Sequence, residues 1–206
     1  MNPYNLRWSE AAIQRRKIIM HGYDAKNLAQ AFRTVRKNTI QIAEEIPEEK
    51  YDFRPAEGVR TAGETLKHLA ISTLWPIRVH GQRISEVKFE MFGEVMAASA
   101  AAEAKLHTKA DILKALHDNG EEFAGFVEGL SDAALAETVS FPAATNQPPK
   151  TRFEMLLSPK EHEMHHRGQL MLVERMLGIT PHLTRQMQER LAAYQQQQHQ
   201  SSAQGA

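Results

Sequence analysis

Apolar residues recur every three or four positions in several parts of this chain, the spacing that places them on one face of an α-helix. The first run starts after Asp24 and stops before Pro47, and its steps alternate between four and three, as in helices that pack in bundles: Leu28, Phe32, Val35, Thr39, Ile42 and Ile46. A second run follows Thr108 and Asp111, which have the spacing of a helix cap: Ile112, Leu116, Gly120, Phe123, Val127 and Leu130. Each run predicts a long amphipathic helix.

Another helix is predicted from Thr61 to about Gly81. Thr61 and Glu64 have the spacing of a capping box, and Pro76 is expected to kink the helix. Its two sides are both apolar, with Leu66, Leu69, Ala70, Thr73 and Ile77 on one and His68, Ile71 and Trp75 on the other. Such a helix is buried on both sides, between the bundle and either a partner or a crossover of the same chain.

The fourth predicted helix has two candidate starts. Ser158 and Pro159, followed by Glu161, have the order of an N-cap, a first helical position and a carboxylate that reaches back, while Thr151 with Glu154 forms an earlier start. Either one helix begins near residue 152 and kinks at the proline, or two helical pieces meet there. Gly178 is expected to end the helix in the left-handed conformation.

The remaining segments have weaker patterns. Residues 82–107 lack a sustained period, and we interpret them as a long crossover with one or two short helical turns, the connection that parallel neighbouring helices require. The TVSF stretch at 138–141 is expected to be briefly extended. Pro181 precedes a last helix with Leu183, Met187 and Leu191 at steps of four, and the glutamine-rich end is low-complexity sequence.

These patterns predict an all-α fold, a four-helix bundle with a long crossover between its second and third helices and extra helical segments at both ends. The predicted units are an N-terminal extension at 1–23, in which RWSEAAIQRRKIIM is compatible with a short helix, the bundle at 24–180, a C-terminal helix at 181–196 and a disordered tail at 197–206.

Composition excludes several classes of function. The 206 residues include 25 Lys and Arg and 25 Asp and Glu, so the formal charge is zero and no basic surplus indicates binding to nucleic acid or acidic lipid. Cysteine is absent, which leaves histidine and carboxylates as the strong metal ligands. Neither a signal-peptide core nor an apolar run of membrane-spanning length occurs, so we expect a cytoplasmic protein.

Two histidines lie one helical turn apart on the inward side of the fourth helix. His162 and His166 differ by roughly 40° around the helix and share a stripe with Leu170, Val173 and Leu177. Imidazoles at this spacing are close enough to bind one metal ion. The alternative is a core histidine bonded to a neighbouring helix, with the other in a partly wet groove. His165 lies on the flank, and His107 and His117 lie off the inward stripe of their region.

Three stretches resemble the DinB (damage-inducible) family, also described as the DinB/YfiT-like metalloenzyme superfamily. EHEMHHRGQLMLVERMLGITP resembles its last-helix signature, TAGETLKHLA its second-helix motif, and IPEEKYDFRPAEGVRT the loop before that helix. The resemblance covers roughly residues 24–180, and Pro159 departs from the pattern because a helix former is usual there. It implies a three-histidine metal site, with ligands at His68, His162 and His166. Gln169 is a candidate hydrogen-bonding partner of a ligand, and Arg167 is expected in a surface salt bridge.

Three neutral imidazoles leave a divalent ion with open positions, zinc being the first expectation and nickel the second. Such an ion lowers the pKa of a bound water or thiol. Characterised relatives resemble transferases that use low-molecular-weight thiols such as bacillithiol or mycothiol, and some similar proteins are isomerases. By resemblance, the first hypothesis is therefore metal-assisted thiol transfer to a small electrophilic molecule.

Two other functions remain open. A metal-dependent hydrolase of a small molecule needs a general base beside the metal, and neither Glu161 nor Glu163 is placed for it on the helix. A non-catalytic, metal-binding stress or interaction protein would have no cavity beside the histidines. The doubly apolar helix also predicts a homodimer. A pocket of a few hundred cubic ångströms at the histidines would favour an enzyme.

Overall fold

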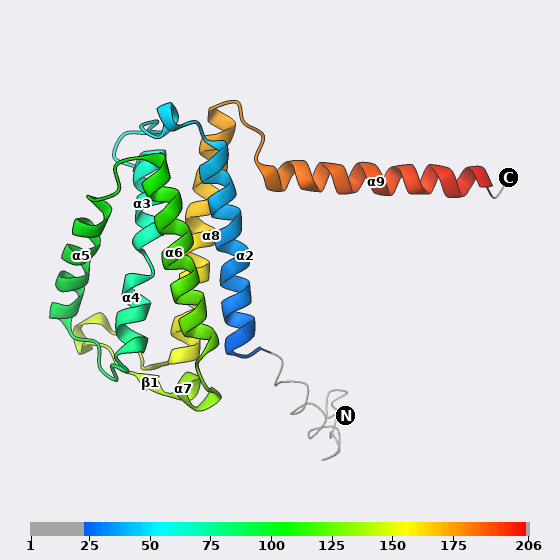
Figure 1. Ribbon diagram of the computed structural model, residues 1–206. Coiled ribbons are helices and arrows are strands. Elements are labelled where there is room, and N and C mark those ends of the chain that lie inside the picture. Colours follow the sequence, from blue (N-terminus) through cyan, green and yellow to red (C-terminus); the bar gives the residue numbers. More distant parts are fainter. Residues whose placement is uncertain (1–22, 205–206) are drawn as a thin grey trace, which may run out of the picture.

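Four long helical segments stand side by side in the computed structural model, which describes residues 23–204 (Figure 1). They are α2 (Ala25–Glu45), α3 (Ala62–Ile71) with its continuation α4 (Leu74–Pro76), α6 (Lys109–Glu128) and α8 (Arg152–Met176). The predicted all-α four-helix bundle, with a long connection between its second and third helices, is confirmed. The short helix expected within the N-terminal extension lies outside the described residues.

The predicted caps fix where the bundle helices begin. Thr61, Thr108 and Thr151 each accept a hydrogen bond from a backbone N–H three residues on, and the carboxylates of Glu64, Asp111 and Glu154 bond back to them. Asp24 and Asn27 form the same box at the start of α2. At the other end of α8, Gly178 takes a positive φ of 80°, as expected for the residue that follows a helix.

α8 is one helix that passes through Pro159, so Ser158 does not cap a separate helix. The Thr151 box begins the helix first, and Ser158 then lies in its second turn. The proline removes one N–H and therefore one helical hydrogen bond, but Leu156 and Glu163 are buried on either side of it. Packing against the bundle thus keeps the helix continuous where local propensity alone would end it.

The predicted helix from Thr61 to Gly81 is broken rather than kinked. α3 ends at Ile71, α4 resumes at Leu74, and residues Ile77–Gly81 form a short π-helix, η2. The ring of Pro76 crowds the carbonyl group of Ser72, four residues earlier, and offers it no N–H. The interruption accordingly lies one turn before the proline.

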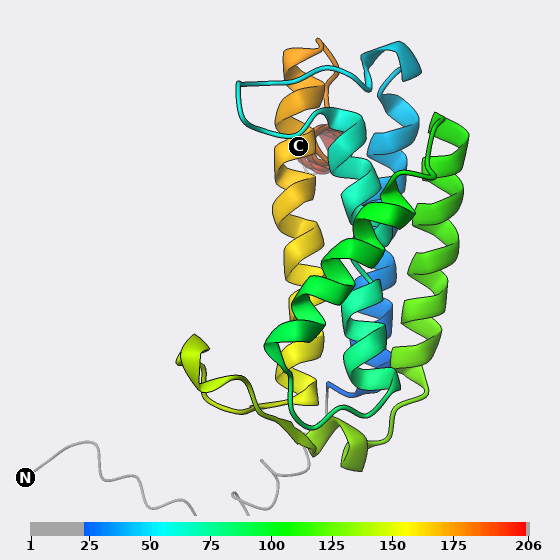
Figure 2. The same cartoon turned by 90° about the vertical axis from the view of Figure 1, so that its left-hand side faces the viewer.

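A fifth helix occupies most of the predicted crossover. α5 (Phe89–Glu103) packs across the outside of α3 and α4 (Figure 2). Ile71 is buried, and the ring of Trp75 stacks on Phe92 with 4.7 Å between centroids. The second apolar side of residues 62–77 is therefore covered by α5 of the same chain. A doubly apolar helix thus does not require a second copy of the protein.

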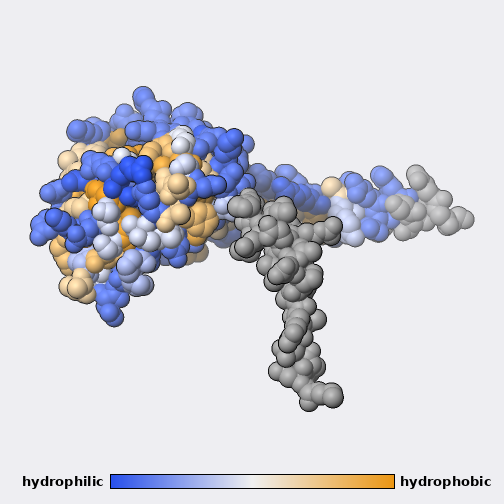
Figure 3. Space-filling model, turned by 90° about the horizontal axis from the view of Figure 1, so that it is seen from below, coloured by the Kyte–Doolittle hydropathy of each residue, from blue (hydrophilic) through white to orange (hydrophobic). Residues whose placement is uncertain are grey.

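Short elements close the lower end of the bundle. They are α7 (Asp132–Ala136), the 3-10 turn η3 (Ala143–Thr145) and two strands, β1 (Thr138–Val139) and β2 (Lys150–Thr151), which pair antiparallel. The predicted extended piece at 138–141 is thus present as β1. At the upper end, the 3-10 turn η1 (Glu48–Lys50) follows α2. Seen from below, hydrophobic residues gather on the lower end of the bundle between hydrophilic ones (Figure 3).

A buried ion pair joins all four bundle helices. Arg36 on α2 donates from Nε to Oε1 of Glu163 on α8 at 2.8 Å, and both side chains are buried. The two Nη groups donate to the carbonyl oxygens of Leu116 on α6, at 2.7 Å, and Leu69 on α3, at 3.0 Å. Gly120 leaves space for the Arg36 side chain, since a Cβ at residue 120 would lie 2.9 Å from Cγ of Arg36. We call this set the Arg36 clamp.

α9 (His182–Gln204) leaves the bundle at a steep angle and projects into solvent (Figure 1). Contacts near its start hold it to the bundle: Arg185 on Glu45, His182 on Asn38, and Arg175 of α8 on Thr184. The sequence predicted disorder from residue 197, but the helix continues to Gln204, because glutamine is a good helix former. No helix in the described part of the chain is long and apolar enough to cross a bilayer.

A buried carboxylate lies where α8 approaches α9. Among the described residues, neither oxygen of Glu174 has a hydrogen-bond partner. Burial raises its pKa to about 7, with Glu45 adding to the rise and Arg185 and Arg175 opposing it. The neighbouring His182 is buried too. Since the folded pKa exceeds the ordinary value of 4.5, the stability that Glu174 contributes is complete below about pH 4.5 and is lost as the pH rises through about 7.

Glu174→Gln is therefore expected to be more stable than the wild type at pH 8 and to lose that advantage at pH 5, where the native carboxyl is already neutral. Urea unfolding at the two pH values measures the difference. An identical pH dependence in wild type and variant would show that this carboxyl does not titrate between them.

Candidate metal centre

Three imidazole rings from two distant parts of the chain meet inside the bundle. His68 comes from α3, and His162 and His166 come from successive turns of α8. The Nε2 atoms of His68 and His162 are 3.0 Å apart, and one ring nitrogen of each of the three lies within 4.8 Å of the others. The ring centroids are 4.6 to 5.1 Å apart. The structure thus brings together the three residues that the sequence motifs selected.

The Arg36 clamp sets the distance between the two helices that carry these rings. Its contacts are the carbonyl of Leu69, which directly follows His68, and the carboxylate of Glu163, which directly follows His162. One guanidinium therefore holds α3 and α8 together at the level of the histidines. A buried charged group serves this purpose well because its geometry is fixed by several hydrogen bonds at once.

Side-chain contacts turn the rings toward one another. Nδ1 of His166 lies 2.7 Å from Oε1 of Gln169, and the Gln169 amide group lies 3.2 Å from Nε2 of His165. Nδ1 of His68 lies 3.6 Å from Oε1 of Glu103 on α5. Because Nδ1 of His166 is engaged by Gln169, its Nε2 is left to face the common centre, where Nε2 of His68 and of His162 meet.

All three imidazoles are neutral near pH 7. Burial lowers the pKa of His68 and of His162 to about 4, and it lowers the pKa of His166 as well. The positive charge of Arg60, in the loop before α3, contributes to each of these shifts. Neutral imidazole is the form that binds a metal ion, so no proton has to be removed first.

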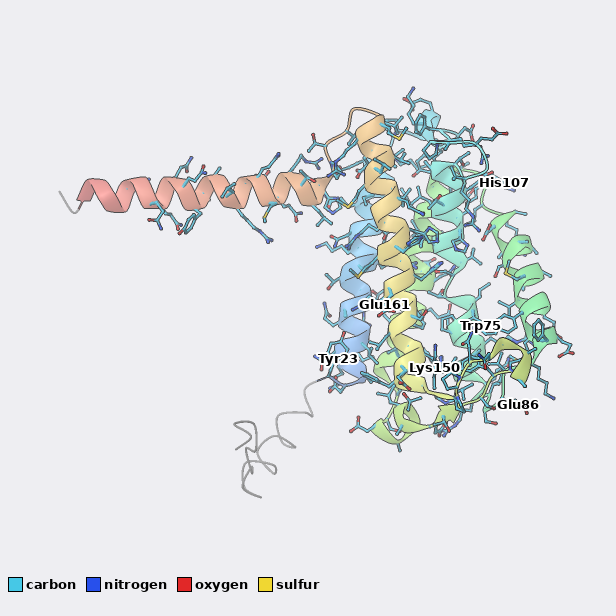
Figure 4. All side chains as sticks on the ribbon, turned by 180° about the vertical axis from the view of Figure 1, so that it is seen from behind. Tyr23, Trp75, Glu86, His107, Lys150 and Glu161 are labelled. Carbon is cyan, nitrogen blue, oxygen red and sulfur yellow. The ribbon has the colours of Figure 1, made fainter. Side chains whose placement is uncertain are left out.

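A cavity of about 440 Å³ opens beside His68 and His162. Trp75 and Lys150, two of its lining residues, lie between α8 and α5 toward the lower end of the bundle (Figure 4). Most of the lining is apolar, and its largest side chains come from α4, α5, α8 and the segment before β2: Trp75, Phe92, Met96, Phe141 and Met155. The volume suits a small organic molecule held next to the three rings.

Residues 31–170 match the sequence profile of the DinB superfamily. The chain belongs to this superfamily. The match spans the bundle from α2 into α8, including all three histidines.

Two DinB-like relatives come from Bacillus subtilis. The uncharacterised protein YjoA is 26% identical over 152 residues, which cover 72% of this chain and 88% of that protein, and its crystal structure has a TM-score of 0.55 over 74% of this chain and 92% of its own. YfiT, described as a probable metal-dependent hydrolase with an unusual four-helix bundle topology, is 17% identical with a TM-score of 0.60, covering 76% of this chain and 89% of its own. At these identities the structural likeness shows a shared fold.

Glu103 approaches a ring of this DinB protein, but the carboxylates of α8 near the histidines are placed differently. Glu163 is held by Arg36, and Glu161 is exposed. Glu154 lines the cavity but accepts hydrogen bonds from the N–H and hydroxyl of Thr151. Among the described residues, Glu154 is the only carboxylate that lines this cavity, and its Oε2 is held by the Thr151 cap.

Glu103 and His80 are site residues that sequence reasoning missed. Glu103 lies in the alanine-rich part of the predicted crossover, where no period indicated which side faces inward. His80, buried in η2, lines the cavity and lies 3.3 Å from Nη1 of Arg152. The break near Pro76 shifts the helical register, so the wheel of residues 61–81 could not place it.

The other histidines and Arg167 lie apart from this centre. His165 is exposed and contacts Gln169, while His107 and His117 are exposed as expected. Arg167 was expected in a surface salt bridge, but it forms none with the described residues, and its Nε is buried without a hydrogen-bond partner.

Proposed function

We propose that this DinB protein is a metal-dependent transferase that joins a low-molecular-weight thiol to a small electrophile, with His68, His162 and His166 holding the ion. The observation that carries the proposal is the position of the three rings. One ring nitrogen of each lies within 4.8 Å of the others, and His68 and His162 line a largely apolar cavity of about 440 Å³. A pocket that opens onto the centre favours an enzyme over a purely structural metal site.

The donor set fits a divalent ion. The three imidazoles are neutral and come from rigid helices, and Gln169 orients His166 through Nδ1. Three protein ligands are the usual number in catalytic zinc sites, and nickel also accepts imidazole. When bound, the ion would supply a Lewis acid that lowers the pKa of a thiol to near neutrality.

The surrounding residues suit a thiol and an apolar partner. Trp75, Phe92 and Phe141 offer aromatic walls that exclude water and would bind an apolar electrophile. The charge of Arg60, which acts on all three imidazoles, would favour a thiolate over a neutral thiol. Thiol transfer needs no further general base once the thiol is ionised, so it does not depend on a carboxylate in the cavity.

A metal-dependent hydrolase is the second candidate, because YfiT carries that description and shares the fold. It would use the same three histidines. It ranks below thiol transfer because the only carboxylate in the described lining of the cavity, Glu154, is tied to the Thr151 cap. A non-catalytic metal-binding role ranks third, because it does not account for the cavity beside the histidines.

A thiol-consumption assay distinguishes these functions. Untagged protein loaded with zinc or nickel is supplied with a thiol and an activated aromatic chloride, and loss of both reactants is followed. Thiol transfer gives metal-dependent formation of the conjugate. Turnover by metal-free protein would eliminate the mechanism, and metal-dependent hydrolysis of an ester without thiol would favour the hydrolase.

Gln169→Leu is expected to weaken metal binding by roughly 10- to 100-fold, because it removes the group that orients His166 through Nδ1. The measurement is competition with a metal-chelating dye. Gln30→Leu, at an exposed position of α2, is the matched control and should bind normally. Equal affinities in the two variants would contradict the orienting role.

A further inference from the structure

α9 carries an apolar stripe that nothing in the described chain covers. Met187, Leu191 and Tyr194 are each between 55 and 68% exposed, and with Leu183 they follow one another at steps of four, four and three, so they share one face. The helix projects from the bundle, touching it only near its start (Figure 1). A helix is only marginally stable in water on its own, so packing against a partner surface would stabilise a free arm of this kind.

A second exposed stripe runs along the outside of α8. Met164, Leu172 and Met176 lie at multiples of four and are each between 43 and 57% exposed. Gly168 occupies the missing step. A Cβ at that position would meet nothing within 4 Å, although glycine inside a helix costs roughly 1 kcal/mol relative to alanine. Nothing within the described chain explains the glycine, but a surface packed on this stripe would.

The two stripes are matched in length and cannot meet within one chain. From Leu183 to Tyr194 the arm stripe spans roughly 17 Å, and from Met164 to Met176 the α8 stripe spans roughly 18 Å. α9 turns away from α8 after Gly178 and extends outward, so its stripe never reaches the α8 of its own chain (Figures 1 and 4). In a dimer, the α8 stripe of a second copy can contact the arm stripe of the first.

We propose that two copies of this chain exchange their α9 arms, each arm packing its Met187, Leu191 and Tyr194 along the α8 stripe of the other copy. A twofold exchange makes the contact twice, as closed dimers require. It would cover twelve exposed side chains at roughly 100 Å² apiece, about half of a large side chain. That reaches the lower end of the roughly 1,200–2,000 Å² buried in specific interfaces.

Pairing of the two arms with each other is the less favourable arrangement. Beyond Tyr194 the arm continues as glutamine-rich sequence, so a coiled coil between arms would have fewer than two apolar heptads. The α8 stripe, by contrast, belongs to a helix that the bundle already holds, and binding to it orders only the arm. This dimer does not depend on the proposed chemistry. It also does not use the doubly apolar helix at 61–81, which α5 already covers.

Light scattering coupled to size exclusion on the full chain tests the exchange. The wild type is expected at twice the chain mass of 23.3 kDa. Leu191→Glu on the arm and Leu172→Glu on α8 should each weaken dimerisation at least tenfold, while Gln188→Glu, beside the stripe, should not. An equal mixture of Leu191→Glu with Leu172→Lys should regain part of the lost association, since one contact of the mixed dimer then pairs opposite charges.

Gly168→Leu separates the interface from folding, because its side chain has open space within the chain yet would obstruct the arm. The variant is expected to fold at least as stably as the wild type, because a helical glycine is replaced, while its dimer is weakened. A monomeric wild type, or a dimer that survives both glutamate variants, would overturn the proposal. Loss of the dimer in Leu191→Glu but not in Leu172→Glu would also overturn it, because the arms would then pair with each other.

Discussion

His162→Ala is expected to lose the bound ion and thiol turnover together. Its Nε2 faces Nε2 of His68 at 3.0 Å, and within the part of the chain that the structure describes no other histidine is placed to replace it, since His165 contacts Gln169. Loss of an orienting group alone weakens metal sites by roughly 10- to 100-fold, so loss of a ligand should cost at least about 100-fold in affinity. Metal analysis of untagged protein and the thiol-consumption assay provide the two measurements.

His117→Ala is the matched control, because that histidine is exposed on α6 and contacts only Asp118 among the described residues. It should retain both metal and turnover. If His162→Ala lost its metal but kept full turnover, the ion would have no part in the reaction.

Arg36→Met is expected to lower the free energy of unfolding by about 3–5 kcal/mol, since it leaves the carboxylate of Glu163 buried without its partner. It also frees the carbonyl groups of Leu69 and Leu116. Urea unfolding measures the loss. Arg33→Met is the matched control, because Arg33 pairs with the exposed Glu121 and Glu128 and such pairs contribute about 1 kcal/mol or less.

The double variant Arg36→Met with Glu163→Leu separates the two parts of that loss. Removing both charges leaves no unpaired group, so most of the stability should return. Metal affinity is expected to be lower than in the wild type, because the link between α3 and α8 is gone. A double variant as unstable as Arg36→Met would show that shape, and not the buried charge, dominates at this position.

The bundle was predictable because its helices are specified by short-range sequence patterns. The stripe from Leu28 to Ile46, the stripe from Ile112 to Leu130 and the three threonine caps depend on residues three or four apart, and all of them are present as expected. The pair His162 and His166 was found in the same way. Only the family motif linked His68 to them, because no local rule relates positions 94 residues apart.

The features that escaped prediction depend on tertiary contacts. α5 buries only Val95 among its own residues, so it shows no inward stripe, and Glu103 could not be assigned to His68. Glu163 was placed on the flank of α8 by the helical wheel, yet it is buried because Arg36, 127 residues away, neutralises it. Ser158 had the form of a cap, but the earlier box at Thr151 had already begun the helix.

The most direct test of the three-histidine centre is anomalous diffraction from crystals grown with zinc. We expect one strong peak per chain, within about 2.0–2.1 Å of Nε2 of His68, His162 and His166 alike. A zinc peak at surface histidines such as His107 and His117, with no density between the three rings, would contradict it.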